Sequence, residues 1–590
     1  MGDVAIRPLS NQTVIALPRG GPPVVVPAMA AHALTTCSRF RSLDEHKVHI
    51  GAAMRLPPER ASHVIDELLA AGLLLSEPDL FAGCARSTSS PVSIETVCIL
   101  TRDRPQALDD ALASYLAQCR RHGRSPEFAV FDDSTSSAVR DEARTRLTKL
   151  ARDQGVAISY AGVEEKQNAR DLLAATSGVA PELLAFALGN PEGFASSTGA
   201  NRNAVLLHTA GRAFFSADDD TLCRPGVTKD AAPGFALVGE IDPTELHFFD
   251  RREDALGSVR FVDEDVLAAH EQLLGRGVGS LLATAAGPYD LDRMCGHALR
   301  ALQSETASVA VTFSGLVGDS GMYSPGWLLT CDSSATFARL TESEAAYQRA
   351  LSSREISRAV TRTTVAHGGV CMGAFFAADN RQLLPPFFPV LRNQDGVFGT
   401  TLAVSGDAYA GYLPHVLPHN AASRTYSPGY MVAVSVVRMS DIVMAILSMV
   451  GASLPRLPDR ASTFRALGER IQELGRLNEE DFHEAVRSAL FRVAAPVMTR
   501  MESQLARPGL PPFIARDLAK RMSLLSASVC GEDYPIPSDL PQGGDRSALR
   551  AMTRRLVLQH GHLLARWAEI VQAAAELHGS GRPVARPLAD

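Results

Sequence analysis

The sequence predicts an α/β protein with a mostly parallel central sheet covered by helices, preceded by a small α/β module and followed by a helical bundle. Three observations predict this arrangement. Short apolar runs alternate with amphipathic stretches over residues 92–430, a polar linker occupies 85–91, and apolar residues recur at helical spacing from 431 onward. We therefore divide the 590 residues into segments 1–90, 92–430 and 431–590.

The composition is that of an ordinary globular protein, with 46% apolar and 21% charged residues. A net charge of −7 argues against a broad nucleic-acid-binding surface, which needs clustered Lys and Arg. None of the nine cysteines forms a C-x-x-C pair, so neither a zinc ribbon nor a disulfide framework is indicated. No signal peptide is recognisable, and the apolar stretch 430–454 carries Arg438 and Asp441 near its middle. We expect a cytoplasmic protein with no transmembrane segment.

In segment 1–90, residues 13–17 and 24–26 have strand-like composition, and 58–72 has helical periodicity ending at Gly72. The apolar run 73–76 suits a further strand. Helices followed by this L-L-A-A-G-L-L-L ending resemble a winged-helix domain.

Segment 92–430 alternates strands and helices. The expected strands are 94–100, 127–131, 156–160 and 213–217. The expected helices are 107–118, 139–154, one beginning near 164, and 203–210. Ligands bind at the carboxyl ends of parallel strands, and two acidic clusters follow such ends, Asp132-Asp133 and Asp218-Asp219-Asp220. We therefore expect both clusters to belong to one site.

The acidic triplet at 218–220 is suited to holding a cation. Two carboxylates spaced D-x-D at a strand end can share a divalent ion, which neutralises a leaving diphosphate without transferring a proton. Taken alone, the triplet is weak support, because most acidic triplets are solvated turns. Its meaning depends on the motifs around it.

Four motifs occur in order. They are Cys98-Ile-Leu-Thr-Arg-Asp-Arg-Pro105, Ala129-Val-Phe-Asp-Asp-Ser-Thr135, Gly199-Ala-Asn-Arg-Asn-Ala204 and Gly211-Arg-Ala-Phe-Phe-Ser-Ala-Asp-Asp-Asp220. This ordered set resembles family 2 glycosyltransferases, whose strands and turns carry the same features in the same sequence. The resemblance implies a GT-A domain, with a Rossmann-like sheet, that takes a sugar from a nucleotide-sugar. A UDP-sugar donor and inversion at the anomeric carbon are also implied by the resemblance alone.

The resemblance assigns the first two motifs to the nucleotide. Thr101 and Arg104 would lie against the base. Asp133, or alternatively Asp132, would bind uracil or ribose.

The third and fourth motifs are assigned to the diphosphate and the metal. Arg202 would reach the diphosphate, with Asn203 stabilising the turn beside it. Asp218 would contact ribose and metal, Asp220 the metal, and Asp219 is grouped with the donor-binding residues. The plain alternative for Arg202-Asn203 is a helix start with ordinary capping.

Two later segments complete the implied site. Leu391-Arg-Asn-Gln-Asp-Gly-Val-Phe-Gly399 resembles the x-E-D helix start that carries the general base, with Gln394 replacing the usual Glu. Asp395 is therefore the candidate base, unless it only caps a helix. Leu413-Pro-His-Val-Leu-Pro-His419 supplies His415 and His419 as candidate ligands for Mn²⁺ or Mg²⁺. The sequence does not choose between the two histidines.

Three other interpretations fit the sequence less well. A phosphatase of the haloacid dehalogenase type also uses D-x-D, but Leu222 stands where that family has Thr or Val. A nucleotidyltransferase would need a Gly-rich loop after the first strand, and Thr101-Arg-Asp-Arg-Pro105 has no Gly. A binding protein on a degenerate transferase fold would have no need of the matching acidic residues.

The flanking segments bear on the acceptor. A winged-helix module ahead of a modifying enzyme resembles the recognition element of enzymes that modify ribosomally made peptides, which bind a leader peptide at a sheet edge. This resemblance favours a peptide or protein acceptor held by residues 1–90. A small molecule or a polysaccharide is the alternative acceptor. The C-terminal helices could form a homodimer or cover the acceptor groove.

Overall fold

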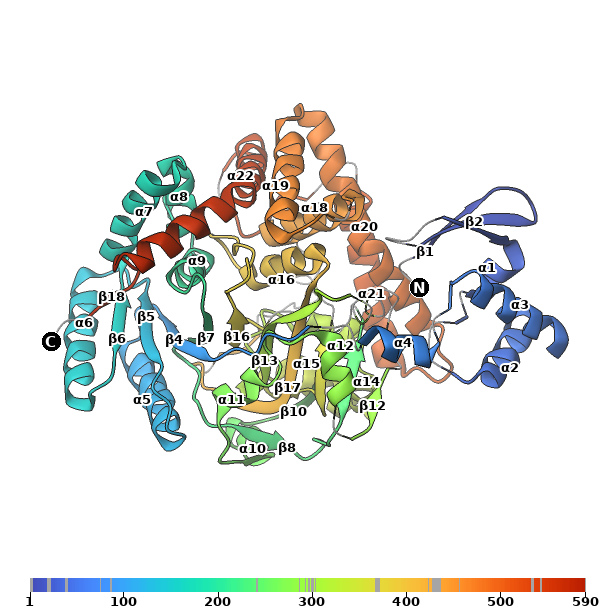
Figure 1. The fold of residues 1–590 in the computed structure, drawn as a ribbon, viewed down its shortest axis with the longest axis horizontal. Coiled ribbons are helices and arrows are strands. Elements are labelled where there is room, and N and C mark those ends of the chain that lie inside the picture. Colours follow the sequence, from blue (N-terminus) through green and yellow to red (C-terminus); the bar gives the residue numbers. More distant parts are fainter. Residues whose placement is uncertain are drawn as a thin grey trace.

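The structure is a computed structural model with three visible parts. Figure 1 shows a small N-terminal module, a large body built on one sheet, and long helices lying across one side of that body. The residues described are 4–588 except 19–22, 35, 38–40, 75, 85–87, 240–241, 286, 292, 295–297, 299–301, 303, 367–371, 423, 427–436, 456, 532–534 and 542–543.

The N-terminal module combines an antiparallel sheet with three helices. Its elements are β1 (Val4–Pro8), β2 (Thr13–Pro18), β3 (Val24–Pro27), α1 (Ala28–Leu34), α2 (Leu43–Met54) and α3 (Pro58–Ala70). The strands expected at 13–17 and 24–26 are confirmed as β2 and β3. Ile65 and Leu68 of α3 are buried in the core of the module, and Gly72 follows in the left-handed conformation with φ 65°.

The strand expected at 73–76 is wrong for the residues described there. The amide of Leu73 bonds back to the last turn of α3 at 3.0 Å, and the next element is the helix α4 (Glu77–Cys84). Leu80 and Cys84 of α4 are buried in a core shared with α12 (Val278–Thr284). The helix α4 therefore packs on the large body, whereas α3 packs within the N-terminal module.

The first half of the large body is a block of four parallel strands in the order β6-β5-β4-β7. Its elements are β4 (Ile94–Thr101), α5 (Pro105–Arg121), β5 (Glu127–Asp132), α6 (Ser137–Gln154), β6 (Ile158–Ala161), α7 (Val163–Ser177), α8 (Pro181–Leu188), α9 (Thr198–His208) and β7 (Ala213–Asp218). All four strands expected from the sequence are confirmed. Their apolar side chains are buried on both faces, as strands between two helical layers require.

The second half extends the same sheet in mixed directions, because β16 runs antiparallel to β7 and joins the two halves. Its elements are β8 (Gly226–Thr228), β9 (Phe235–Val238), β10 (Glu245–Phe249), α10 (Arg252–Gly257), β11 (Val259–Phe261), α11 (Val266–Glu271), α12, β12 (Tyr289–Asp290), β13 (Ser308–Asp319), the 3-10 helix η1 (Pro325–Thr330), α14 (Ser334–Thr341), α15 (Glu344–Ser352), β14 (Glu355–Ala359), β15 (Thr363–Ala366), β16 (Phe375–Asp379), α16 (Gln394–Ser405) and β17 (Ala408–His419). The principal strand order is β12-β9-β15-β17-β13-β16-β7-β4-β5-β6-β18. The predicted α/β class is confirmed.

The C-terminal helices are α18 (Met439–Ser453), α19 (Arg460–Arg476), α20 (Glu479–Leu505), α21 (Pro512–Val529) and α22 (Arg546–Gly579). Most of them share one hydrophobic core with the helices over the main sheet, and Trp567 of α22 donates to the carbonyl of Leu384 at 2.7 Å. The predicted helical segment is thus fused to the body. Within the part of the chain that the structure describes, no helix is long and apolar enough to cross a membrane. Residues 430–436 of the apolar stretch lie outside that part.

A two-residue strand, β18 (Arg586–Pro587), closes the sheet edge beside α6 (Figure 1). It runs antiparallel to β6, and the amide of Ala585 donates to Nδ1 of the buried His208 at 3.2 Å. The edge strand of the parallel block is therefore covered by residues from the other end of the chain.

Candidate functional site

A cavity of about 500 Å³ lies at the carboxyl ends of β4, β5 and β7. Eight of the residues predicted from the sequence line it together: Thr101, Arg104, Asp133, Arg202, Asp218, Asp220, Asp395 and His419. Four others do not line it: Asp132, Asn203, Asp219 and His415. Residues far apart in the chain thus converge at the sheet edge where α/β folds bind ligands.

Asp218 ends β7 and faces the cavity. Its carboxylate pairs with Arg202 at 2.7 Å, and the same guanidinium, only 2% exposed, also donates to the carbonyl of Gly373. Burial raises the pKa of Asp218 to about 6, although Arg202 opposes the rise. A cation bound beside Asp218 would favour its ionised form.

Asp219 follows β7 in a turn and does not line the cavity. It is 1% exposed, accepts a hydrogen bond from the Thr101 hydroxyl at 2.7 Å and pairs with Arg104 at 2.6 Å. Burial raises the pKa of Asp219 to about 7. We therefore correct its predicted role in donor binding. Asp219 holds Thr101 and Arg104, which line the cavity, and does not line it itself.

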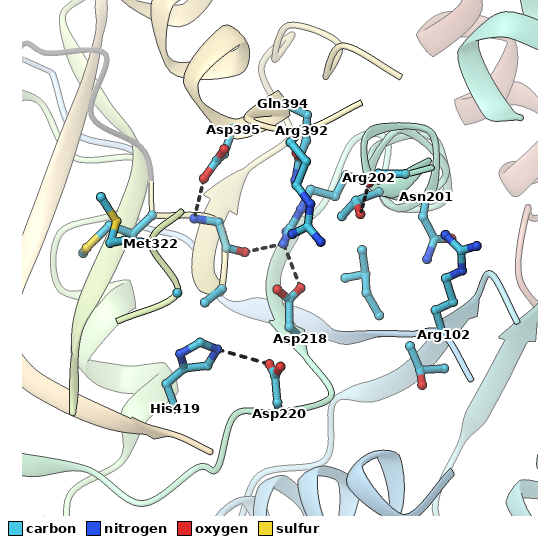
Figure 2. A pocket seen from close by; sticks show the side chains of 18 of the residues that line it. Arg102, Asn201, Arg202, Asp218, Asp220, Met322, Arg392, Gln394, Asp395 and His419 are labelled. Atoms are coloured by element: carbon cyan, nitrogen blue, oxygen red, sulfur yellow. Dashed lines mark hydrogen bonds and ion pairs between the residues drawn. The ribbon is translucent and has the colours of Figure 1, made fainter. Parts of the chain in front are cut away.

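Asp220 lies between two cationic or potentially cationic groups. Arg104 pairs with Oδ2 of Asp220 at 2.7 Å, and Nε2 of His419 lies 3.3 Å from Oδ1 (Figure 2). Burial alone would raise the pKa of Asp220, but His419 and Arg104 outweigh it and hold that pKa well below its usual range. Burial likewise lowers the pKa of His419, yet Asp220 raises it overall.

The tautomer of His419 follows from its other ring nitrogen. Nδ1 lies 2.6 Å from the backbone carbonyl of Asp319. Since a carbonyl only accepts, Nδ1 must carry a hydrogen, and in the neutral ring Nε2 presents its lone pair toward Asp220. Such fixing of one nitrogen by a backbone carbonyl is how metal-binding histidines are held.

The donor set was tested against the metal that the family resemblance implies. Among the described residues, no three or more His, Cys, Asp or Glu side chains gather closely enough to hold a metal by themselves. Mg²⁺ sites commonly need only one or two protein ligands, with substrate phosphates and water completing the shell. Oδ1 of Asp220 is buried and is paired with Nε2 of His419 at 3.3 Å, so one carboxylate oxygen and one imidazole nitrogen face each other. Oxygen and imidazole donors of this kind fit Mn²⁺ or Mg²⁺ shared with a substrate.

Asp133 follows β5 and lines the cavity. Its carboxylate pairs with Lys166 and accepts a hydrogen bond from Ser197 at 3.0 Å. Lys166 is 4% exposed and also bonds the side chain of Asn201 at 3.0 Å and the carbonyl of Asp132 at 3.1 Å. Asp133 therefore enters the cavity as an oriented group held by a buried cation.

Asp132 has a supporting role, which corrects its prediction as an alternative base-binding residue. It is 1% exposed, and its carboxylate accepts from the Tyr160 hydroxyl at 2.8 Å and from the amide of Ser134 at 2.7 Å. These bonds use the carboxylate to shape the turn that presents Asp133.

Asn203, grouped with the donor-binding residues and expected to stabilise the turn beside Arg202, lies behind the wall and bonds backbone groups there. Its side chain is fully buried and donates to the carbonyl of Phe387 at 3.0 Å while accepting from the amide of Phe387 at 2.8 Å. A Cβ on Gly199 would lie 1.8 Å from the carbonyl oxygen of Phe388. Only glycine permits this approach, so the start of α9 is locked to the segment leading into α16.

Asp395, the candidate base, lies in the first turn of α16 and faces the cavity (Figure 2). Its Oδ2 accepts from the amide of Gly373 at 3.3 Å, and the carbonyl of Gly373 accepts from Arg202. The helix-cap position belongs to Asn393, which makes no side-chain cap bond. Asp395 is therefore not the capping residue. Gly373 connects it to Arg202, through the amide on one side and the carbonyl on the other.

His415 lies outside the cavity, unlike His419. It sits where β17 pairs with β8, and Nε2 is 2.6 Å from Glu264. It lies outside the cavity, whereas His419 stands at the end of β17 and inside it. Of the two candidates, only His419 can contact a ligand bound with Asp218 and Asp220.

The cavity has further residues that sequence reasoning missed, among them Arg102, Arg358, Arg392, Arg424 and Met322. Arg392 extends toward Arg202 and Asp218 in Figure 2. It stands between Leu391 and Asn393, which both adopt positive φ, 67° and 66°. This costly backbone points to a functional constraint at Arg392. Its position three residues before Asp395 was the one sequence signal.

No model of a known protein family matches the chain, and no curated protein matches it either.

Proposed function

We propose that the chain is a metal-dependent glycosyltransferase of the GT-A kind that moves a sugar from a UDP-sugar to an acceptor with inversion. The observation that carries the proposal is the convergence of eight motif residues, spread over positions 101–419, on one cavity. Chance matches to four short motifs would have no reason to meet at the carboxyl ends of parallel strands.

The donor wall is assigned from its charges. Asp133, oriented by Lys166, binds the base or ribose, with Thr101 beside it. Arg202 and Arg392 face the diphosphate, because paired guanidinium groups favour a phosphate dianion.

The leaving diphosphate needs further neutralisation. A bound Mn²⁺ or Mg²⁺, held by Asp220 and His419 with Asp218 beside them, would supply it as a Lewis acid.

Asp395 is the proposed general base. It takes the proton from the acceptor atom as that atom bonds to the anomeric carbon, while the bond from the sugar to the diphosphate breaks and its electron pair leaves with the diphosphate. The Gly373 amide holds the Asp395 carboxylate, and Figure 2 places Asp395 and Asp220 on different sides of the cavity. The base and the leaving group are thereby kept apart, as inversion requires.

The proposed acceptor is a peptide or protein in natural-product modification. In the N-terminal module, β3 pairs with β2 on one side and is the last strand of the described sheet. Val25 on β3 is 59% exposed. An extended peptide can add to such an edge as a further strand, and tethering raises its effective concentration near the cavity. A small-molecule or polysaccharide acceptor, or a non-catalytic binding role, remains the alternative.

The donor assignment is tested by screening nucleotide-sugars for thermal stabilisation and hydrolysis with and without Mn²⁺. We expect one nucleotide-sugar, a UDP-sugar, to raise Tm in the presence of Mn²⁺ and to be slowly hydrolysed. If no nucleotide-sugar produces either response, the proposal is wrong.

The acceptor assignment is tested with Val25→Lys. For a peptide that the wild type glycosylates, the variant should raise KM several-fold and leave donor hydrolysis unchanged. The matched control is Val48→Lys, because Val48 is a 74% exposed valine on α2 of the same module. Equal KM values in both variants would contradict peptide binding at β3.

A further inference from the structure

Asp319 ends β13 next to the proposed metal site and is the most heavily bonded carboxylate near it. It is 1% exposed and forms a bidentate ion pair with Arg354, whose two hydrogen bonds are 2.8 and 2.9 Å long. Arg424 adds a bond at 3.0 Å, and the amide of Gly321 adds another at 2.8 Å. By itself this set describes a stable structural ion pair.

The backbone carbonyl of Asp319 also orients the imidazole of His419. It accepts the hydrogen of Nδ1 of His419 at 2.6 Å, and this bond aims Nε2 at Asp220. Gly318, next to Asp319, has φ 114°, and a Cβ there would lie 2.6 Å from the carbonyl oxygen of His419. The backbone around Asp319 is thus packed directly against the backbone of His419. Any movement of Asp319 would turn or shift the imidazole.

The loop after Asp319 is tied to the same arginine. Arg354 donates to the carbonyl of Met322 at 2.7 Å, and its own carbonyl accepts from the amide of Ser320 at 2.7 Å. Ser320 and Met322 line the cavity. Arg354 therefore fixes both the carboxylate of Asp319 and the loop that follows it.

We propose that Asp319 and Arg354 form a positioning pair that fixes the imidazole of His419 for the divalent cation. The inference rests on the proposed function, since it needs His419 to bind that cation. Neither residue has to touch the substrate, because the pair acts through the Asp319 carbonyl. Groups that orient a metal-binding histidine typically change metal affinity by about 10–100-fold when they are removed.

The chain offers a matched control for removing such an ion pair. Asp379 ends β16, is 1% exposed and forms a bidentate ion pair with Arg381 at 2.8 and 2.9 Å. It therefore resembles Asp319 in burial and in its bidentate pairing with one arginine. It lines no part of the cavity. Asp379→Asn therefore also breaks the bidentate ion pair of a buried carboxylate at a strand end, with a smaller stability cost than Asp319→Asn because Asp379 lacks a second arginine, and it leaves the site untouched.

The experiment measures Mn²⁺ affinity in the full chain with UDP present, from the electron paramagnetic resonance signal of free Mn²⁺. We expect Asp319→Asn to weaken Mn²⁺ binding by about 10–100-fold. Asp379→Asn should leave it within about twofold of wild type. Arg354→Lys keeps the charge but loses the fork geometry, so it should give a smaller loss in the same direction and serves if Asp319→Asn fails to fold.

A double-mutant cycle shows whether the pair acts through His419. In a His419→Ala background, Asp319→Asn should cause no further loss of Mn²⁺ affinity. The inference is overturned if wild-type affinity persists in Asp319→Asn and Arg354→Lys, if Asp379→Asn weakens binding equally, or if the loss is undiminished without His419. If wild type binds no Mn²⁺ with UDP, the proposed function itself fails and the inference fails with it.

Discussion

The two walls of the cavity are positioned by different physical means. On the donor wall, Thr101, Asp133 and Asp218 stand at or directly after strand ends, so hydrogen-bonded backbone places them. Buried Lys166 and Arg202 then orient the two carboxylates. On the facing wall, side chains are placed by other side chains: Arg358 is held by Asp242 at 2.6 Å. His419 is held through Asp319, as described above.

The two walls should therefore differ in how strongly a single substitution changes their geometry. A parallel sheet fixes its strand ends collectively, and a single substitution moves them little. A wall held by buried ion pairs depends on each pair, because breaking one leaves an uncompensated buried charge. The backbone of the donor wall should therefore be robust, and the facing wall should be the place where substitutions change function most selectively.

The largest expected effect lies on the facing wall. Asp395→Asn should lower kcat for sugar transfer by about 10²–10⁴-fold, because it removes the proposed proton acceptor. The affinity for UDP with Mn²⁺, measured by calorimetry, should stay within a few-fold of wild type. Gln394→Ala, next to it on the same wall, serves as the control and should retain most activity. A large loss of UDP affinity in Asp395→Asn would show that the two walls are not separable.

The donor wall should respond in a different pattern. Asp220→Asn should lower transfer by about 10²–10³-fold, because it removes a carboxylate that faces the developing diphosphate charge. It should also abolish the Mn²⁺-dependent rise in Tm with UDP. His415→Ala removes an imidazole outside the cavity and should change neither quantity. A retained Mn²⁺ response in Asp220→Asn would contradict its assignment as a ligand.

Arg392 links the two walls, and its effect should be intermediate. Arg392→Ala should weaken binding of a UDP-sugar by about 10-fold, the size expected for one charge-assisted hydrogen bond. Arg392→Lys should recover part of the affinity. The measurement is a titration followed by calorimetry. Unchanged affinity in Arg392→Ala would place this side chain outside the donor site.

The smallest effect concerns pH and the buried Asp219. A carboxyl whose pKa is raised on folding binds a proton more readily in the folded chain, so it lowers stability as pH rises above the unfolded value near 4. The pKa of Asp219 is raised to about 7, so its destabilising effect grows between about pH 4 and pH 7. Relative to wild type, Asp219→Asn should gain a few degrees of Tm as pH goes from 4.5 to 7.5. If the Tm of wild type and of Asp219→Asn changed with pH in parallel, the raised pKa of Asp219 would be contradicted.

The sequence could predict the donor wall because local patterns determine it. Apolar runs marked β4, β5, β6 and β7, and the residues after them fell at one edge as parallel strands require. The same reasoning left Asp132 open beside Asp133, and it grouped Asp219 with the donor-binding residues although Asp219 does not line the cavity. Which of two adjacent side chains faces the cavity depends on partners such as Lys166 and Tyr160, which lie on other elements.

The facing wall could not be predicted to the same extent. Asp395 and His419 were found through motifs, but Asp319 and Arg354 are joined only in space, and their sequence surroundings are those of ordinary strand ends. Lys166 was missed for a related reason. It stands in Val163-Glu-Glu-Lys-Gln167, which is typical of an exposed helix start, yet tertiary packing buries it.

The placement of β16 and β18 has a consequence for synthesis of the chain. The parallel block β4 to β7 leaves the ribosome with both of its edges unpaired. The edge at β7 is paired only when β16 (Phe375–Asp379) has been made, and the edge at β6 only when β18 (Arg586–Pro587) has been made. Translation proceeds at about 5–20 residues per second, so these edges stay open for many seconds and can pair with other nascent chains. Expression at low temperature or with chaperones should therefore raise the yield of native protein more than any change within the cavity.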